Sequence, residues 1–586
     1  MNLIKKALTV LVLGTIVLTS SVLFAREVKI TTRVMTEQEF NKFKGKIGVY
    51  EEGRNYNIII DGHGTGLKPP TEEQWEEIRK MAVLVDKMKF SRDVAPPSHD
   101  NSATNWFPPI GNQDGEGSCV SWACGYYCKT FQEAKEHNWD LSGCVWEGGY
   151  HGHPSVAYQD KIFSPDFIYH QVNDGEDNGS CYSDNMNLLH RIGCCTWDKM
   201  PYDPANSTTW PDEDAWRQAP LYRSLTSFNY MDVTTNAGLA NLKQWLADGN
   251  LAVISVDAGY YDDLTVDDLW TVDNYNPSGT NHANTIVGYD DNYGPYSEAG
   301  NPNTYGAFKV ANSWGVGGSW ENVADGFYYI SYECMKQRIE YIYFYENWVG
   351  YEPEMIAVFQ LSHNLRGECE TTFGIGDISS PISTKRFDDY NFNGGEHPFP
   401  SNNMVMDITE FVPYMSGPPD NLFLGIYDGG STITGTIEFF SIEIYDDYGS
   451  GIPIETYASS DPPVNTVNIS DVYAQLTTGE NVISVLPSDL PVSWHAGDAA
   501  FDVICSGFGV MSWTASVVSG GSWLSITSGS SGTGNDTIKV HYDENTDIHP
   551  RVGEIRVACS EAINNPVDVS VSQLGFQVNE VLVWSP

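Results

Sequence analysis

Three residues that lie far apart in the sequence can together form a nucleophilic catalytic site. Cys119 follows a glycine-rich loop, residues 113–118, and begins a predicted helix. A helix N-terminus favours the thiolate, the form of cysteine that attacks a carbonyl carbon. A thiolate catalyst needs an imidazole to take and return the proton, and the imidazole needs an acceptor on its other nitrogen. His282, at the start of a predicted strand, and Asn312, at the end of another, can fill these two roles.

The order of these residues resembles that of papain-like cysteine peptidases. Gln113 comes first, Cys119 follows, and His282 precedes the Asn312 of an Asn-Ser-Trp-Gly motif. Other stretches resemble the family's internal landmarks, glycine-rich loop and closing strand: residues 164–169, 201–202, 315–320 and 325–330. The resemblance covers residues 98–345 and implies an α+β fold with two lobes, one helical and one β-barrel-like.

The resemblance also implies a role for each residue of the site. Cys119 is the nucleophile and forms a thioester, His282 is the general base and acid, and Asn312 holds the imidazole ring. Trp314 shields the bond between the ring and the amide from water. Gln113 donates its side-chain amide to the oxyanion, a contribution of roughly 3 kcal/mol for one such donor. Each residue alone has an ordinary structural reading, as a core, turn or loop residue, but all of them in this order favour catalysis.

The sequence departs from the family pattern in two respects. Glu116 stands where the family has a disulfide cysteine, so that bridge is absent. The separation of Cys119 and His282 is 282 − 119 = 163 residues, longer than the ~130–150 typical of the family. These departures predict surface insertions, which affect specificity more than chemistry.

A substrate-binding edge is expected next to the nucleophile. Gly179 and Ser180 resemble the edge on which the family pairs its substrate backbone, and Cys181 would then line the pocket for the P2 side chain. Together with Trp314, Gly179 and Ser180 are the predicted substrate contacts. A plain turn that ends in a disulfide cysteine is an equally compatible reading of this stretch.

A second histidine segment, residues 61–66, resembles that of subtilisin-like serine peptidases. The matching Gly-Thr-Ser-x-Ala serine motif does not follow it in the sequence. We therefore predict a glycine-rich turn here and exclude His63 from catalysis.

The overall charge limits the possible partners. The 586 residues carry 32 Lys and Arg against 77 Asp and Glu, a net charge of −45. This inventory can hardly supply the basic surface that nucleic acids or anionic membranes require. Hydrophobic residues make up 41%, as in folded proteins, and roughly 150 residues per domain gives three or four domains.

The N-terminus resembles a secretory signal. Lys5 and Lys6 precede an apolar run, residues 7–24, and cleavage is expected after Ala25. An uncleaved anchor is the alternative. We expect an exported monomer that is secreted, at the cell surface or in the periplasm, with no membrane span in the mature chain.

The cysteine count is odd, at eleven, so at least one thiol stays unpaired within the chain. Cys505 and Cys559, on two predicted strands, are candidates for a disulfide. Neither Cys124 with Cys128 nor the adjacent Cys194 and Cys195 has the spacing of a structural zinc site. No metal or organic cofactor is expected.

Periodicity and turn residues divide the chain into modules. Residues 26–97 occupy the position of a propeptide, which we expect to block the cleft until it is cut, and contain a predicted amphipathic helix over 72–90. Residues 120–136 and 185–191 are further predicted helices. Predicted strands cover 251–256, 327–332 and 436–445. The expected boundaries are signal 1–25, propeptide 26–97, peptidase 98–345, jelly-roll-like β-sandwich 346–470, linker 471–481, second sandwich 482–576 and tail 577–586.

The second sandwich resembles BACON domains, small β-sandwiches found beside secreted carbohydrate-active enzymes and peptidases. The similarity lies in residues 513–516, 522–526, 551–555 and 569–573. The resemblance implies contact with glycan or mucin, or a plain spacer. Trp513 and Trp523 are expected in the core of this module rather than on a sugar-binding surface.

Taken together, the sequence predicts an exported papain-like endopeptidase, made as a precursor, that acts on protein or peptide substrates. The alternative is a surface glycan-binding or adhesion protein in which the peptidase-like domain is a non-catalytic scaffold. A transglutaminase-like acyl transferase would also use a thiol and an imidazole, but with Asp as third member, so Asn312 disfavours it.

Overall fold

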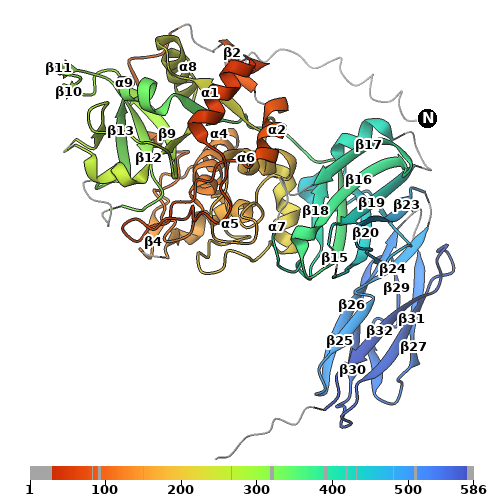
Figure 1. Cartoon of the computed structure of the whole chain (residues 1–586). Coiled ribbons are helices and arrows are strands. Elements are labelled where there is room, and N and C mark those ends of the chain that lie inside the picture. Colours follow the sequence, from red (N-terminus) through yellow and green to blue (C-terminus); the bar gives the residue numbers. More distant parts are fainter. Residues whose placement is uncertain are drawn as a thin grey trace, which may run out of the picture.

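The chain forms a mixed helix-and-sheet body followed by two all-β units (Figure 1). The predicted signal peptide 1–25, residues 317–320 of the predicted glycine-rich loop and the tail 577–586 lie outside the described residues. No helix in the described part of the chain is long and apolar enough to cross a membrane. The computed structural model describes residues 29–81, 83–89, 94–149, 151–265, 267–316, 323–387, 394–415, 420–430, 432–479, 481–506 and 511–576.

The N-terminal segment joins the sheet of the body. Strand β1 (Lys29–Val34) pairs antiparallel with β2 (Val83–Lys89), and β2 pairs parallel with β6 (Asn229–Asp232). Helix α1 (Glu37–Ile47) begins at a reciprocal capping box. The prediction of one helix over 72–90 is wrong beyond Met81, where α2 (Glu72–Met81) ends. The valines that follow are β-branched and pair as the strand β2.

One continuous helical run begins at the predicted nucleophile. It consists of α3 (Cys119–Ser121), the π-helical η2 (Trp122–Lys129) and α4 (Thr130–Glu136), which confirms the helix predicted over 120–136. The helix predicted over 185–191 is the second part of α6 (Tyr182–Arg191). The remaining elements of this half are η1 (Asn101–Ala103), β4 (Trp146–Glu147), β5 (His153–Pro154), η3 (Val156–Lys161), α5 (Pro165–Tyr169), α7 (Glu213–Gln218) and η4 (Ala219–Tyr222).

A ten-stranded sheet forms the other half of the body, in the order β1-β2-β6-β14-β7-β9-β12-β13-β8, with β3 beside β9. Strands β9 (His282–Asp290) and β12 (Ala307–Ala311) are antiparallel neighbours, with Thr285 opposite Ala311. The start of β9 and the residue after β12 therefore lie at the same end of the sheet. The other elements here are β3 (Ser98–Asp100), α8 (Asn236–Ala247), β7 (Ala252–Val256), η5 (Ala258–Asp263), β8 (Leu269–Trp270), β10 (Tyr296–Glu298), β11 (Asn301–Thr304), β13 (Phe327–Ser331), α9 (Tyr332–Cys334), η6 (Met335–Ile339) and β14 (Tyr341–Phe344).

The first all-β unit is a sandwich of two antiparallel sheets. One has the order β18-β15-β20-β21 with β22 beside β20, and the other β17-β16-β19-β23. The linker predicted over 471–481 is shorter, because β23 occupies most of it and pairs with β19 along its length. The elements are β15 (Met355–Ser362), η7 (Arg366–Glu368), β16 (Cys369–Asp377), β17 (Ser380–Phe387), β18 (Met404–Asp407), η8 (Thr409–Tyr414), β19 (Asn421–Asp428), β20 (Thr436–Ile444), η9 (Tyr448–Ser450), β21 (Glu455–Ala458), β22 (Val464–Asn465) and β23 (Ser470–Thr477).

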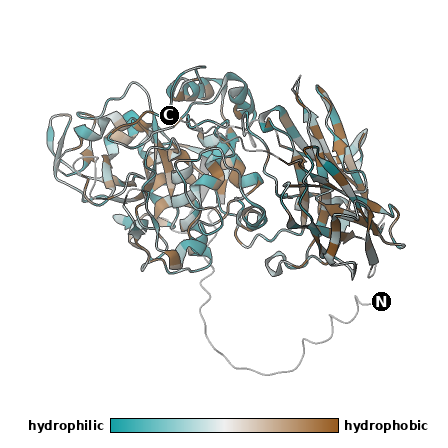
Figure 2. Ribbon diagram, turned by 90° about the horizontal axis from the view of Figure 1, so that it is seen from below, coloured by the Kyte–Doolittle hydropathy of each residue, from teal (hydrophilic) through white to brown (hydrophobic). Residues whose placement is uncertain are grey.

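The second all-β unit is also a two-sheet sandwich, with the orders β24-β26-β30-β28 and β25-β32-β31-β27-β29. Apolar and polar residues alternate along its strands, as the brown and teal segments of Figure 2 show, so one face of each sheet is buried. Trp513 and Trp523 are buried in its core, as predicted. The strands are β24 (Val482–Leu486), β25 (Asp489–Val492), β26 (Gly497–Ser506), β27 (Ser512–Ser519), β28 (Leu524–Ser528), β29 (Ser531–Thr533), β30 (Asp536–Tyr542), β31 (Arg551–Ala558) and β32 (Val567–Gln573).

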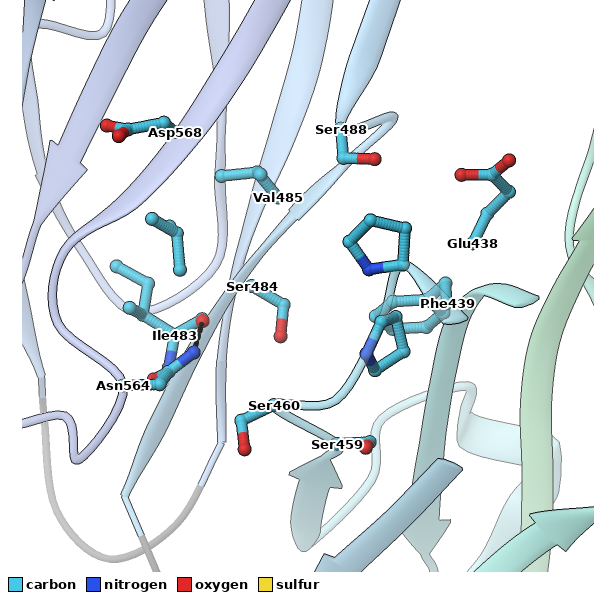
Figure 3. Close-up of a pocket in the computed structure, with 13 residues that line it drawn as sticks. Glu438, Phe439, Ser459, Ser460, Ile483, Ser484, Val485, Ser488, Asn564 and Asp568 are labelled. Atoms are coloured by element: carbon cyan, nitrogen blue, oxygen red, sulfur yellow. Dashed lines mark hydrogen bonds between the residues drawn. The ribbon is translucent and has the colours of Figure 1, made fainter. Parts of the chain in front are cut away.

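Polar contacts connect the three parts. Arg223 of the body donates to Asp407 of the first sandwich at 2.6 Å, and both side chains are buried. The backbone N–H of Ala458 donates to Ser506 of the second sandwich at 2.8 Å. Figure 3 shows the cavity between the two sandwiches, which Phe439 lines on one side and Ile483 on the other.

All eleven cysteines are free thiols. The predicted disulfide between Cys505 and Cys559 is therefore not formed in this structure, and a covalent framework does not hold the folded units together. Apolar packing does so instead, since one cluster of buried residues runs from the body into the first sandwich.

Candidate active site

The elements that carry the predicted nucleophile and the predicted imidazole, α3 and β9, pack against each other. Cys119 is the first residue of α3 and is 0% exposed. Its thiol accepts a backbone hydrogen bond from Ala283, the second residue of β9. Because His282 is the first residue of that strand, the sulfur lies beside the start of β9, where the chain also carries the imidazole. The thiol and the His282 Nδ1 form no hydrogen bond in this structure.

The imidazole is oriented by the predicted amide. The Nε2 of His282 lies 2.8 Å from the Oδ1 of Asn312. A carboxamide oxygen only accepts, so this geometry assigns the proton to Nε2. The other ring nitrogen, Nδ1, is buried and has no hydrogen-bond partner among the described residues. In the neutral ring it is a free lone pair, which is what a general base requires.

A further residue, Asn284, orients Asn312. Its Nδ2 donates to the Asn312 Oδ1 at 2.8 Å, while its own Oδ1 accepts from the hydroxyls of Tyr261 and Tyr328 at 2.6 and 2.9 Å. The sequence analysis did not identify this role. Asn284 comes two residues after His282 on the same strand, so its side chain points to the same face, and this spacing was the available signal.

The predicted oxyanion donor and indole are also at the site. Gln113 is 0% exposed, and its Oε1 accepts from the Ser313 hydroxyl at 2.6 Å. This bond leaves the Nε2 of Gln113 as the end of the amide that can donate. The indole of Trp314 packs against the His282 ring, with centroids 4.8 Å apart, and so covers the imidazole.

Burial makes the predicted catalytic pair, Cys119 and His282, neutral in this state. It raises the pKa of the Cys119 thiol to about 12 and lowers the pKa of His282 to about 3. The thiolate expected at a helix N-terminus is thus not the form present here, because desolvation of the charge outweighs the N-terminal dipole.

A segment from the N-terminal region, Gly64–Lys68, covers the site. The Gly64 carbonyl accepts from the Gln113 Nε2 at 3.0 Å and from the Trp314 indole at 3.2 Å. The backbone N–H of Leu67 donates to the carbonyl of Asn281, the residue before His282, at 2.9 Å. The segment therefore occupies the hydrogen-bonding groups predicted to bind substrate.

The predicted substrate edge binds the same segment. The Ser180 N–H donates to Gly66 at 2.9 Å, and the Ser180 carbonyl accepts from Lys68 at 3.0 Å, which makes a parallel bridge between Leu67 and Ser180. Gly179 has φ +90°, and a Cβ there would lie 2.3 Å from the Gly66 carbonyl. The edge thus pairs with a backbone segment of this chain, and its pairing with substrate stays a prediction.

His63 lies in the predicted glycine-rich turn, closed by a bridge between Ile60 and His63. The position of this turn was not predicted. The His63 ring stacks on the Trp314 indole at 5.1 Å with an interplanar angle of 11°, and burial lowers its pKa. The turn thereby extends the cover over the site.

The close fit of the segment depends on glycine. A Cβ at Gly66, whose φ is +109°, would lie 2.0 Å from the Gly117 carbonyl, and a Cβ at Gly64 would lie 2.3 Å from the Glu116 carbonyl. Any larger residue at either position would displace the segment from the loop that precedes Cys119.

Two groups of described side chains bring possible metal ligands together. One consists of Glu116, Asp166 and His170, the other of His363, Glu368 and Asp428. Neither contains a residue predicted to act in catalysis.

No family model matches the chain, and no curated protein matches it. Among solved structures, the procathepsin L2 proteinase from the Tenebrio molitor larval midgut is 15% identical over 53% of this chain and 87% of its own, with a TM-score of 0.35. The cysteine protease and lectin-like domains of Cwp84 from Clostridium difficile are 13% identical over 77% and 98%, with a TM-score of 0.32.

The match to a GH5 xyloglucanase from Bacteroides ovatus is shorter. It covers 16% of this chain and 19% of the xyloglucanase at 16% identity, with a TM-score of 0.14. Similarities of this size carry no argument about activity. The functional assignment therefore depends on the side chains of the site. A buried imidazole and carboxamide are in contact at the end of β9 that adjoins the buried thiol of Cys119, beneath a covering peptide.

Proposed function

We propose that this chain is the precursor of an exported papain-like cysteine endopeptidase. One observation supports this most directly: His282 is held by Asn312 through Nε2, with its free Nδ1 at the end of β9 that adjoins Cys119. A non-catalytic scaffold has no need for a buried imidazole with an unpaired nitrogen.

The reaction proceeds by acyl transfer through the sulfur. The Nδ1 of His282 takes the thiol proton of Cys119, and the thiolate forms a bond to the scissile carbonyl carbon. The oxyanion accepts a hydrogen bond from Gln113. When the tetrahedral intermediate collapses, the C–N bond breaks and the imidazolium gives its proton to the leaving amine. Water, deprotonated by the same imidazole, then hydrolyses the thioester and releases the acid.

The N-terminal region is proposed to act as an inhibitory propeptide. Gly64–Lys68 uses the hydrogen bonds of Gln113, Ser180 and Asn281 that a substrate backbone would need. Its burial of the catalytic pair also keeps the thiol protonated. Release or cleavage of this region would expose the site to water and to substrate, and would lower the thiol pKa.

The remaining modules extend the proposal. Residues 1–25 direct export, and the mature enzyme acts in the periplasm, at the cell surface or outside the cell. The second sandwich is proposed as a BACON-like module, for which glycan contact and a spacer role are both compatible with two buried tryptophans.

The test is covalent labelling of Cys119. An epoxide-type thiol reagent is added to the intact chain and to chain digested with a second protease that cuts in the N-terminal region, and labelled peptides are mapped by mass spectrometry. We expect no label on Cys119 in the intact chain, because the thiol is 0% exposed. After digestion we expect label on Cys119 together with cleavage of a peptide library. Loss of cleavage in Cys119→Ala completes the assignment, and equal cleavage by that variant would refute it.

A further inference from the structure

The side chains of Glu116, Asp166 and His170 form a second buried polar cluster. Its first member, Glu116, comes three residues before the predicted nucleophile. Each side chain is at most 2% exposed. Glu116 belongs to the loop before α3, whereas Asp166 and His170 stand one turn apart on and just after α5. Their ligand atoms all lie within 4.8 Å of one another. The cluster therefore connects the loop before Cys119 to α5, which lies far from that loop in the sequence.

The cluster lacks the partners that buried charges require. Both carboxylate oxygens of Glu116, the Oδ1 of Asp166 and the Nε2 of His170 are buried without a hydrogen-bond partner among the described residues. The described ion pairs of these two carboxylates involve His170 and no lysine or arginine. The second oxygen of Asp166 accepts from the backbone N–H of Asp203 at 2.6 Å. Unpaired carboxylates in a protein interior are strongly unfavourable, so this cluster must either take up protons or bind a cation.

The orientation of His170 favours a metal ion as that cation. The His170 Nδ1 lies 2.7 Å from the Thr209 carbonyl oxygen, which can only accept, so Nδ1 carries a proton. The neutral ring then directs the lone pair of Nε2 toward the two carboxylates. A backbone carbonyl that accepts from the other nitrogen is the usual arrangement around a metal-bound histidine.

The spacing of the ligand atoms agrees with this interpretation. The His170 Nε2 lies 3.4 Å from the Glu116 Oε1 and 3.6 Å from the Asp166 Oδ1. A protonated His170 bound to either carboxylate would form a charge-assisted hydrogen bond of about 2.7–2.9 Å. Ligands at about 2.0–2.2 Å from a tetrahedral ion lie roughly 3.3–3.6 Å apart. The observed gaps are too long for the first case and are compatible with the second. The direction of the lone pair must then decide, since the same gap also occurs between His363 and Asp428.

The other candidate cluster provides an internal contrast. The His363 Nδ1 accepts from the backbone N–H of Leu365 at 3.0 Å, so the proton of the neutral ring is on Nε2. That nitrogen faces Asp428 at 3.4 Å as a donor, and Thr466 already donates to the same carboxylate at 2.7 Å. The lone pair points away from the carboxylates, and this cluster has no nitrogen ligand to offer.

We propose that Glu116, Asp166 and His170 bind one divalent transition-metal ion, zinc by its preference for mixed nitrogen and oxygen ligands. With a neutral His170, the two carboxylates balance the charge of the ion. Glu116, with both oxygens free, can bind through one or both of them. The ion has no part in the peptidase reaction: it fixes the loop that carries Gln113 and Cys119 to α5. The sequence analysis expected no metal: the cysteine spacings did not fit zinc, and the three ligands of this cluster come from two separate parts of the chain.

The first experiment measures the metal content of the intact chain carrying Cys119→Ala, so that self-cleavage does not affect the result. The protein is produced without a histidine tag in medium with ZnCl2 or CoCl2 and dialysed against metal-free buffer. We expect about one equivalent of zinc or cobalt per chain and, with cobalt, visible d–d absorption. Glu116→Gln and His170→Asn should lose the metal, whereas the matched control Glu368→Gln should keep it.

Metal-free protein from both preparations would overturn the proposal and leave a protonated His170 as the buried cation. Metal retained by folded Glu116→Gln protein would overturn it as well. If that variant does not fold, X-ray absorption of the zinc-loaded parent decides. Nitrogen and oxygen ligands at about 2.0–2.2 Å with imidazole scattering support the site, and a sulfur shell at about 2.3 Å places the metal on cysteine and refutes it.

Discussion

Two buried histidines near the nucleophile loop, His282 and His170, have similar hydrogen bonding but different neighbours. Each gives one N–H to an oxygen and keeps its second nitrogen unpaired. His282 lies beneath the peptide segment that we propose to be removable, at the strand end that adjoins Cys119, whereas His170 faces two carboxylates within the fold. The neighbours of each ring therefore determine its proposed chemistry. A removable cover leaves a neutral base ready for a proton, and permanent burial with two carboxylates favours a bound cation.

The largest expected effect distinguishes the candidate active site at Cys119 from the proposed metal site at His170. Cys119→Ala should lower peptide cleavage at least 10⁴-fold, because removal of the nucleophile leaves only binding and oxyanion stabilisation. It should leave the metal content unchanged. Cleavage of a fluorogenic peptide by digested protein and metal analysis on the same samples provide the two readouts. Cys505→Ala, in the second sandwich, is the matched control and should retain full activity; an equal loss in both variants would contradict the assignment.

The second prediction concerns the cover, which only His282 has. Gly66→Ala places a Cβ 2.0 Å from the Gly117 carbonyl at φ +109°, so we expect the segment to be displaced and labelling of Cys119 in the uncut chain to rise about 100-fold, which corresponds to about 3 kcal/mol. Gly62→Ala is the control: its φ is +86°, but no atom lies within 4 Å of the added Cβ. Equal labelling rates in the two variants would show that the segment does not protect the thiol.

The third prediction follows from the pKa of His282, which burial lowers to about 3, against about 6.5 for an exposed imidazole. Between these values the open form binds more protons than the covered form, so the cover loses stability as the pH falls from 6.5 to 3. From pH 6.5 to 4.5 the loss is on the order of 2 kcal/mol, or about 30-fold in the population of the open form. His63, whose pKa is also lowered by burial, adds to the same trend.

At alkaline pH the cover loses stability as the pH rises, which is the opposite of its behaviour at acidic pH. The pKa of Cys119 is raised to about 12, against about 8.5 for an exposed thiol. The open form therefore loses its proton first, and the cover weakens as the pH rises from 8.5 to 12. Hydrogen exchange of residues 60–68, corrected for intrinsic rates, should show the strongest protection between pH 6.5 and 8.5. Protection that stays constant down to pH 4.5 would contradict the burial of His282. The variant His282→Ala should show a smaller fall in protection between pH 6.5 and 4.5.

The sequence identified the residues of the candidate site better than it identified their surroundings. Cys119, His282 and Asn312 were identifiable because a nucleophile, base and orienting amide occur in order next to recognisable element ends. The sequence predicted a propeptide over residues 26–97 that blocks the cleft, but it did not predict that Gly64–Lys68 is the covering segment. The close contact of Gly66 with Gly117 joins segments about 50 residues apart, and no local pattern encodes it. Likewise, the boundary between α2 and β2 was missed because strand pairing overrode a helical periodicity.

The metal cluster was missed for a related reason. Asp166 and His170 have the i, i+4 spacing that puts two ligands on one face of a helix, and this signal was visible in the sequence. The third ligand, Glu116, comes from a loop 166 − 116 = 50 residues away. Only the tertiary fold brings the three side chains together.

The smallest expected effect concerns the hydrogen bonds that orient the imidazole rings of His282 and His170. The partner of His170 is a backbone carbonyl, which no side-chain substitution removes, whereas Asn312 is itself oriented by Asn284. Asn284→Ala should lower kcat about tenfold with little change in KM, because a misoriented imidazole transfers protons less efficiently.

Steady-state kinetics of the digested protein measure this effect, with Tyr328→Phe as the control. That variant removes one hydroxyl from the network but keeps the bond from Asn284 to Asn312, together with the hydroxyl of Tyr261. Its kcat should stay within about twofold of the parent, while its stability falls by about 1 kcal/mol. If both variants lose kcat equally, general destabilisation of the core accounts for the loss, and the orientation of Asn312 does not depend on the Asn284 amide. If only Asn284→Ala loses kcat, the His282 ring is held by the hydrogen bonds from Asn284 to Asn312 and from His282 to Asn312. Substitution can change these side-chain contacts, in contrast to the backbone contact of His170.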